Sequence, residues 1–127
     1  MRRWIGICLM AAASAPAWGV TPAEQLAGYA AQAGTPGNVA RGQAFFTQKH
    51  GGEWSCASCH NALPSASGRH ANTGKVLAPL APAFNPERFT DARKTEKWFR
   101  RNCNDVLSRE CSAGEKADVM AYLLSIK

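Results

Sequence analysis

The residues with the clearest chemistry are two cysteines three positions apart and the histidine that directly follows them: Cys56, Cys59 and His60 in the run CASCH. This spacing is the attachment signature of c-type haem. Two thiols at this separation reach the two vinyl groups of one porphyrin, and the adjacent histidine is then delivered to the iron. We therefore predict one covalently attached haem c, with His60 as the proximal iron ligand.

A zinc site and a redox-active dithiol are the alternative interpretations of this cysteine pair. A structural zinc site would need a second ligand pair at similar spacing, whereas Cys103 and Cys111 lie eight residues apart. A thioredoxin-type dithiol would need a strand followed by a helix, and the sequence shows no convincing strand. Haem attachment is the stronger interpretation.

The first nineteen residues resemble a secretory signal peptide. Arg2 and Arg3 precede an apolar run, and small residues surround Ala17 and Gly19. The apolar run is about half the roughly 20 residues that span a bilayer. We predict a signal peptide over 1–19, cleaved after Ala17 or Gly19, and a single monohaem cytochrome c domain over 20–127. The mature protein is expected to be periplasmic and not embedded in the membrane.

Charge adds one local feature to this prediction. Loss of Arg2 and Arg3 lowers the formal net charge from +6 to +4, which is too small an excess to indicate a nucleic-acid partner. Six basic residues nevertheless lie between Arg88 and Arg101. This run predicts either a basic face toward an acidic redox partner or a solvated helix face.

Four helices are predicted around the haem motif. They span residues 21–34, 38–48, 90–102 and 112–126, and the first and last begin with capping boxes, Thr21 with Glu24 and Ser112 with Glu115. Residues 61–86 contain four prolines and no periodicity. We expect an irregular loop that a bound cofactor orders.

The order of these elements resembles that of class I cytochromes c. In that family the first and last helices cross at a glycine, here Gly42, with Phe46 one turn later and the contact expected near Ala121 and Tyr122. The resemblance implies an all-α, class I cytochrome c-like helical domain wrapped around one covalently bound haem. Residues 21–34 would be an extra N-terminal helix.

The second axial ligand is not evident from the residues alone. Electron-transfer members of class I use a methionine in the loop beyond the haem, and this chain has none there. Met120 lies among apolar residues of the last predicted helix and is predicted to fill the core. His50, His70, a lysine, an asparagine or an open position remain, and bis-histidine ligation through His70 is the main rival.

Cys103 and Cys111 are the thiols that remain in the mature chain once haem takes the other pair. An oxidising compartment permits a disulfide between them, worth roughly 2–3 kcal/mol for so short a loop. Such a bridge would either fix the backbone after Asn102 or simply stabilise a small domain.

Residue by residue, the chain closely resembles the sphaeroides haem protein (SHP) family of cytochromes c. The likeness is carried by residues 88–124, by TGKVLAPLAP at 73–82 and by the haem motif, and it covers nearly the whole mature chain. In that family the asparagine of an RNC motif coordinates the oxidised iron, and the adjacent cysteine pairs with the one eight residues later. The resemblance implies Asn102 as distal ligand of the oxidised iron and a disulfide between Cys103 and Cys111.

The resemblance also implies a function. An amide is a weak, hard donor that suits Fe(III) better than Fe(II), so Asn102 is expected to leave on reduction and open the iron to O2, NO or CO. NO-dioxygenase-like oxidation of NO is a further hypothesis, and the family suggests a diheme cytochrome c or a membrane cytochrome b as electron donor. The alternative is a simple electron-transfer cytochrome with asparagine or bis-histidine ligation.

Overall fold

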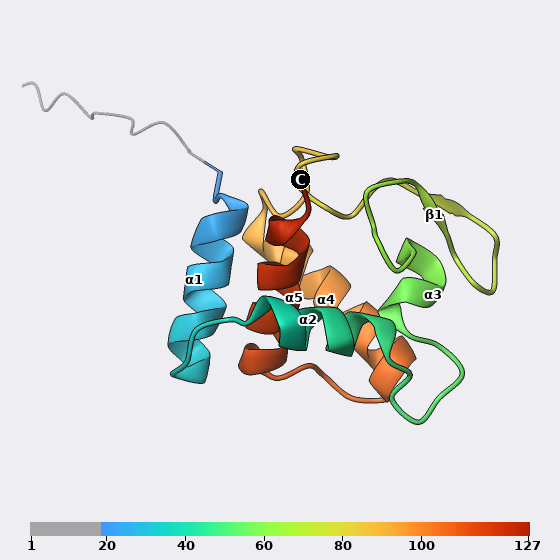
Figure 1. The fold of residues 1–127 in the computed structure, drawn as a ribbon, viewed down its shortest axis with the longest axis horizontal. Coiled ribbons are helices and arrows are strands. Elements are labelled where there is room, and N and C mark those ends of the chain that lie inside the picture. The colour runs from blue at the N-terminus through green and yellow to red at the C-terminus, as the bar shows by residue number, and fades with distance from the viewer. Residues whose placement is uncertain (1–18) are drawn as a thin grey trace, which may run out of the picture.

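The computed structural model describes residues 19–127, so all but the last residue of the predicted signal peptide falls outside the described residues. The elements of the described part are α1 (Pro22–Ala33), α2 (Val39–Thr47), α3 (Cys56–His60), β1 (Gly68–Arg69), β2 (Val76–Leu77), α4 (Ala92–Leu107) and α5 (Ala113–Ser125). Figure 1 shows this helical arrangement, which confirms the predicted all-α fold class. Within residues 19–127, no helix has both the length and the apolar character needed to cross a bilayer.

Helix boundaries follow local capping signals in the sequence. The Thr21 hydroxyl accepts a hydrogen bond from the Glu24 N–H, and the Glu24 carboxylate accepts one from the Thr21 N–H, which completes the predicted capping box. Gly34 ends α1 in the left-handed conformation, with φ 71°. Asn38 and Ser112 cap α2 and α5 through their side-chain oxygens.

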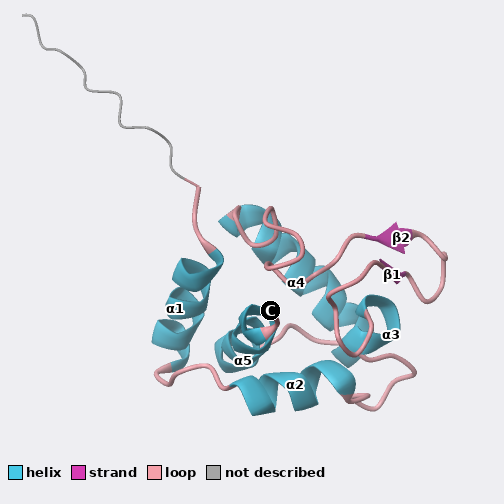
Figure 2. Cartoon of the chain, turned by 45° about the horizontal axis from the view of Figure 1, so that its top comes forward, coloured by secondary structure: helices cyan, strands magenta, loops and turns pink. Residues whose placement is uncertain are grey.

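The packing centre is α5, which α1 and α2 flank (Figures 1 and 2). Gly42 of α2 meets α5 so closely that a Cβ there would collide with the carbonyl oxygen of Asp118. The predicted helix crossing is therefore present, with Asp118 and Tyr122 as its contacts. Met120 is completely buried against Tyr29, so its prediction as core is confirmed.

Helix α4, which carries Asn102, is longer than predicted. It begins after Asp91, whose side chain accepts from the Lys94 N–H, and it continues to Leu107 rather than ending at residue 102. Residues 103–107 contain no glycine or proline to stop the helix. Asn102 therefore lies inside a regular helix, where its backbone position is well defined.

A short antiparallel ribbon interrupts the loop that we expected to be irregular. Gly68 pairs with Leu77, and Arg69 pairs with Val76; strands of two residues are too short to leave a periodic signal. A Cβ on Gly68 would collide with the carbonyl oxygen of Cys59. Glycine at position 68 therefore lets the ribbon lie directly on the helix that carries the haem motif.

Candidate haem site

A cavity of about 640 Å³ brings the haem motif and α4 together. The wall contributed by α4 consists of neighbouring pairs that recur every three or four positions, namely Lys94 and Thr95, Trp98 and Phe99, Asn102 and Cys103, and Asp105 and Val106. That spacing places them on one side of the helix. Because α1 and α2 pack closely on α5 while α4 makes few backbone contacts with the other helices, the cavity lies where α4 would otherwise have met the core.

The size and lining of the cavity fit a haem. Cofactor sites commonly have volumes of about 300–1,000 Å³ and mainly apolar walls with a few polar groups. Phe46, Leu80 and Leu123 belong to the apolar part of the wall. Two free thiols, Cys56 and Cys59, also line it, so the cavity holds both the room and the attachment groups that haem c requires.

His60 ends the short helix α3 at this cavity. The first turn of α3 is fixed by the Ser55 N–H, which donates to the Ser58 hydroxyl at 2.9 Å. Burial, together with the nearby charge of Arg88, lowers the pKa of His60 to about 4. The imidazole is therefore neutral at physiological pH, which is the form that binds iron.

The loop beyond His60 is tied to the helical core. The Tyr122 hydroxyl of α5 donates to the Ala62 carbonyl oxygen at 2.6 Å, and the Ala71 N–H lies 3.2 Å from the Cys59 sulfur. Both contacts hold segments beside the haem motif, so α5 and the ribbon together orient α3.

Asn102 lines the same cavity as His60 and is half-buried there. The structure thus brings together all four residues for which we predicted haem contact, Cys56, Cys59, His60 and Asn102. They come from two helices, and Asn102 lies more than 40 residues after His60 in the sequence.

The other candidates for the second axial ligand differ in position. Among the residues described, those lining the cavity include His70 but neither His50 nor Met120. A ring nitrogen of His50, Nε2, lies 2.8 Å from the Phe45 carbonyl oxygen. His70 Nδ1 accepts from two backbone N–H groups, each at 3.2 Å. The neutral His70 ring then carries its proton on Nε2, which leaves that nitrogen no lone pair for a metal.

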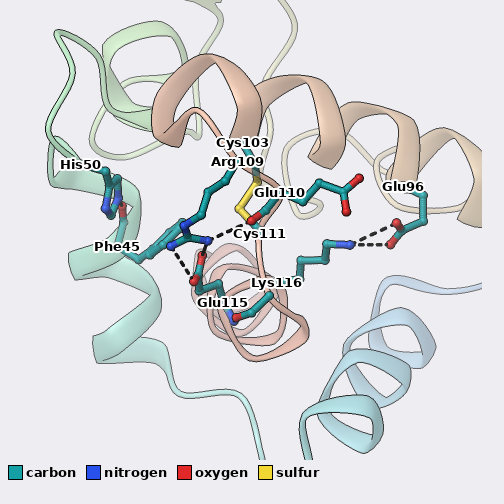
Figure 3. Close-up of a disulfide and its surroundings, with 10 residues drawn as sticks. Phe45, His50, Glu96, Cys103, Arg109, Glu110, Cys111, Glu115 and Lys116 are labelled. Atoms are coloured by element: carbon teal, nitrogen blue, oxygen red, sulfur yellow. Dashed lines mark hydrogen bonds and ion pairs between the residues drawn. A yellow bond between two sulfur atoms is a disulfide. The ribbon is translucent and has the colours of Figure 1, made fainter.

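Cys103 and Cys111 are joined by a disulfide with an S–S distance of 1.98 Å, and both line the cavity (Figure 3). The bridge connects α4 to the segment that leads into α5. In that segment Arg109 donates to the Glu115 carboxylate at 3.0 and 3.2 Å and to the Glu110 carbonyl oxygen at 2.9 Å. The backbone directly after Asn102 is therefore held by one covalent and several polar contacts.

Arg88 is a charged residue of the cavity wall that sequence analysis did not single out. It is half-buried in the wall and close enough to His60 for its charge to lower that pKa. In the sequence it looks like the first of six similar basic residues that end at Arg101. Arg88 differs from the others because it lies before the start of α4 and bonds to the Pro79 carbonyl oxygen. No local sequence pattern indicates this contact.

Comparison with known proteins gives matches over most of the chain. A family model described as a domain of unknown function (DUF1924) matches residues 32–123. The cytochrome c-type protein SHP of Cereibacter sphaeroides is 44% identical over 97% of this chain and 98% of its own length. Cytochrome c'' of Methylophilus methylotrophus is 45% identical over 69% of this chain and 64% of its own length.

Solved structures agree with these matches. Oxidised SHP, described as an oxygen-binding cytochrome c, superposes with a TM-score of 0.79 at 45% identity, over 84% of this chain and 98% of that chain. Oxidised cytochrome c'' from M. methylotrophus superposes with a TM-score of 0.75 at 37% identity, over 84% of this chain and 94% of that chain. These relatives are c-type cytochromes, and the cavity fits their cofactor, covalently bound haem c. The chain belongs to the sphaeroides haem protein family of class I cytochromes c.

Proposed function

We propose that this chain is a periplasmic monohaem cytochrome c that binds O2, NO or CO at an iron position that Asn102 gives up on reduction. The observation that carries the proposal is the presence of Asn102 in the same cavity wall as Cys56, Cys59 and His60. The description of SHP as an oxygen-binding cytochrome c supports it.

Each cavity residue has a distinct task in this proposal. Cys56 and Cys59 hold the haem through thioether bonds, and His60 provides the proximal nitrogen. Haem supplies an iron that changes between Fe(III) and Fe(II) and binds small gases when one axial position is free. The apolar part of the wall, which includes Phe46 and Leu123, would shield the bound haem from water.

Asn102 is suited to act as a ligand that binds the oxidised iron and dissociates on reduction. Its amide oxygen is a neutral, hard donor, which favours Fe(III) over Fe(II). The backbone of α4 is fixed by helical hydrogen bonds and, one residue later, by the disulfide from Cys103. Release then needs only rotation of a side chain with two torsions, and the amide returns to the same place on oxidation.

The alternative function is electron transfer through a bis-histidine iron, and His70 supports it because this residue lines the cavity. The two hydrogen bonds that His70 Nδ1 accepts count against it. They would have to break, or the ring would have to lose its remaining proton, before His70 could bind the iron.

Electrons would enter from the outer face of α4. Trp98 is 41% exposed and also lines the cavity, and the charged groups of Lys97 and Arg101 lie 5.8 and 5.0 Å from its ring. A cationic surface around an exposed aromatic side chain suits an acidic protein partner. We propose this face as the docking site of the electron donor.

NO-dioxygenase-like turnover is a further hypothesis for the same site. Oxidation of NO by O2 to nitrate consumes one electron, which the donor protein would supply. Steady-state NO consumption by the reduced protein should then exceed that of free haem at equal concentration. Equal rates would reject this activity and leave gas binding as the function.

Visible absorption spectra of the purified haem protein test the main proposal. We expect a six-coordinate, low-spin ferric spectrum, a five-coordinate, high-spin ferrous spectrum, and a prompt change when CO is added to the reduced protein. Asn102→Ala should make the ferric iron high-spin or water-bound, and the matched variant His70→Ala should leave it unchanged. A low-spin ferrous spectrum insensitive to CO, or a ferric spectrum that responds only to His70→Ala, would support the electron carrier instead.

A further inference from the structure

Arg88 is a cation inside the cavity wall that is held in place by neutral groups. Its Nε donates to the Pro79 carbonyl oxygen at 3.0 Å, and its Nη2 donates to the Ala78 carbonyl oxygen at 2.9 Å. Two of the five N–H donors of the guanidinium are thus directed to the backbone. These bonds fix the plane and direction of the guanidinium while the group lines the cavity.

No carboxylate of the described chain forms an ion pair with Arg88. The ion pairs recorded within residues 19–127 involve Arg41, Arg100, Arg109 and Lys116. Glu87, Asp91 and Asp105 line the same cavity, yet none is paired with Arg88. Burial lowers the pKa of Arg88, and a partly desolvated cation is stable in a protein mainly when an anion lies beside it.

The cofactor that belongs in this cavity carries two carboxylates, the haem propionates. A guanidinium offers parallel N–H donors that match both oxygens of one carboxylate. We propose that Arg88 binds a haem propionate, and that its positive charge beside the haem and His60 favours the ferrous state in which Asn102 leaves. This inference rests on the proposed function only in taking haem as the occupant of the cavity and Asn102 as the redox-labile ligand.

The charge argument has a definite sign. Replacing Arg88 by a neutral residue makes the surroundings of the haem more negative by one unit, whether or not a propionate remains nearby. Fe(III) carries one positive charge more than Fe(II), so the oxidised state gains stability. One unit of charge at the partly buried edge of a cofactor shifts such an equilibrium by roughly tenfold.

Redox titration of the haem protein, followed by visible absorption, tests the inference. Arg88→Gln should shift the equilibrium about tenfold toward the ferric state, which is about 59 mV for one electron. The control is Arg93→Gln, which removes the same charge from an exposed residue of α4 outside the cavity wall and should shift the equilibrium less than about twofold because solvent screens it. Arg88→Lys keeps the charge but not the paired donors, and its value should lie between wild type and Arg88→Gln.

The propionate bending band in the resonance Raman spectrum gives a second readout. It should move in Arg88→Gln and Arg88→Lys and stay unchanged in Arg93→Gln. If Arg88→Gln fails to retain haem, the band of Arg88→Lys decides the question. Redox and Raman values in the Arg88 variants that equal those of Arg93→Gln would overturn the inference. Failure of the proposed function is separate, because it appears as a low-spin, CO-insensitive ferrous spectrum in the wild-type protein.

Discussion

Replacing Gly42 by alanine tests the helix crossing on which the haem motif depends. A Cβ at this position would overlap the carbonyl group of Asp118, with its carbon at 2.5 Å, and approach Tyr122 Cβ at 3.0 Å. Backbone atoms of a packed helix cannot rotate away, so α2 and α5 must separate. Overpacking of this kind costs about 1–3 kcal/mol, and α2 would also carry Phe46 out of its cluster.

We expect the loss of packing to exceed the gain in helix propensity of about 1 kcal/mol that alanine brings. The free energy of unfolding should therefore fall by about 1–2 kcal/mol, which lowers Tm by about 4–8 °C for a domain near 100 residues. Thermal unfolding of the ferric haem protein, followed by far-ultraviolet circular dichroism and by the Soret band, measures both quantities.

Gly28 provides the matched control in α1. It is exposed, and a Cβ there meets no atom within 4 Å, so Gly28→Ala should raise the free energy of unfolding by about 0.5–1 kcal/mol. The two substitutions are chemically identical, yet their effects on the free energy of unfolding should have opposite signs. If Gly42→Ala unfolded at or above the wild-type Tm, the close crossing of α2 and α5 would be wrong.

Three further perturbations probe the site and its supports. Replacing Cys103 and Cys111 together by serine should lower the free energy of unfolding in urea by about 2–3 kcal/mol and reduce the low-spin fraction of the ferric protein. The double change Lys97→Glu and Arg101→Glu should slow reduction by an acidic protein donor and weaken its salt dependence. Burial alone would raise the pKa of Glu96, but hydrogen bonds from Tyr29 and Lys116 outweigh it and lower the pKa. The Glu96 carboxylate therefore stabilises the fold above its pKa in the unfolded chain, and this stabilisation is lost as the pH falls through its pKa in the folded protein. Below about pH 5 the wild type should lose more stability than Glu96→Gln.

Two of these perturbations have a matched control variant, and for the third one spectral outcome is decisive. Lys49→Glu changes an exposed lysine outside α4 and should affect the donor reaction little; an equal effect would place docking elsewhere. Glu53→Gln alters an exposed carboxylate for which no ion pair is recorded among residues 19–127. This variant should lose as much free energy of unfolding at low pH as the wild type does. An unaltered ferric spectrum in the serine variant would limit the disulfide to a stabilising role.

Local signals in the sequence predicted the parts of the fold that depend on nearby residues. Thr21 and Glu24 cap each other within one turn. The crossing at Gly42, whose contact Asp118 lies far along the chain, was predicted from the resemblance to class I cytochromes c and not from a local signal. The end of α4 was predicted at residue 102 and lies at Leu107. Residues 103–107 permit a helix but carry no signal that requires one, and the disulfide from Cys103 to Cys111 is a contact outside the helix. The same holds for Arg88, whose role depends on carbonyl groups nine and ten residues away in the chain.

The position of Asn102 inside α4 has a consequence for how such a site can change. The helix is anchored by Asp91 at one end and by the disulfide near the other, so its backbone presents residue 102 to the cavity whatever side chain that residue carries. An insertion of one residue between these anchors would turn the position by about 100° and remove it from the wall. A substitution at 102 leaves this backbone geometry intact, so in the proposed function it would alter only the strength and chemical preference of the bond to iron. The proposed function therefore divides between two parts of the chain: the anchored helix fixes where residue 102 lies, and the side chain at 102 would set how strongly the sixth position is held.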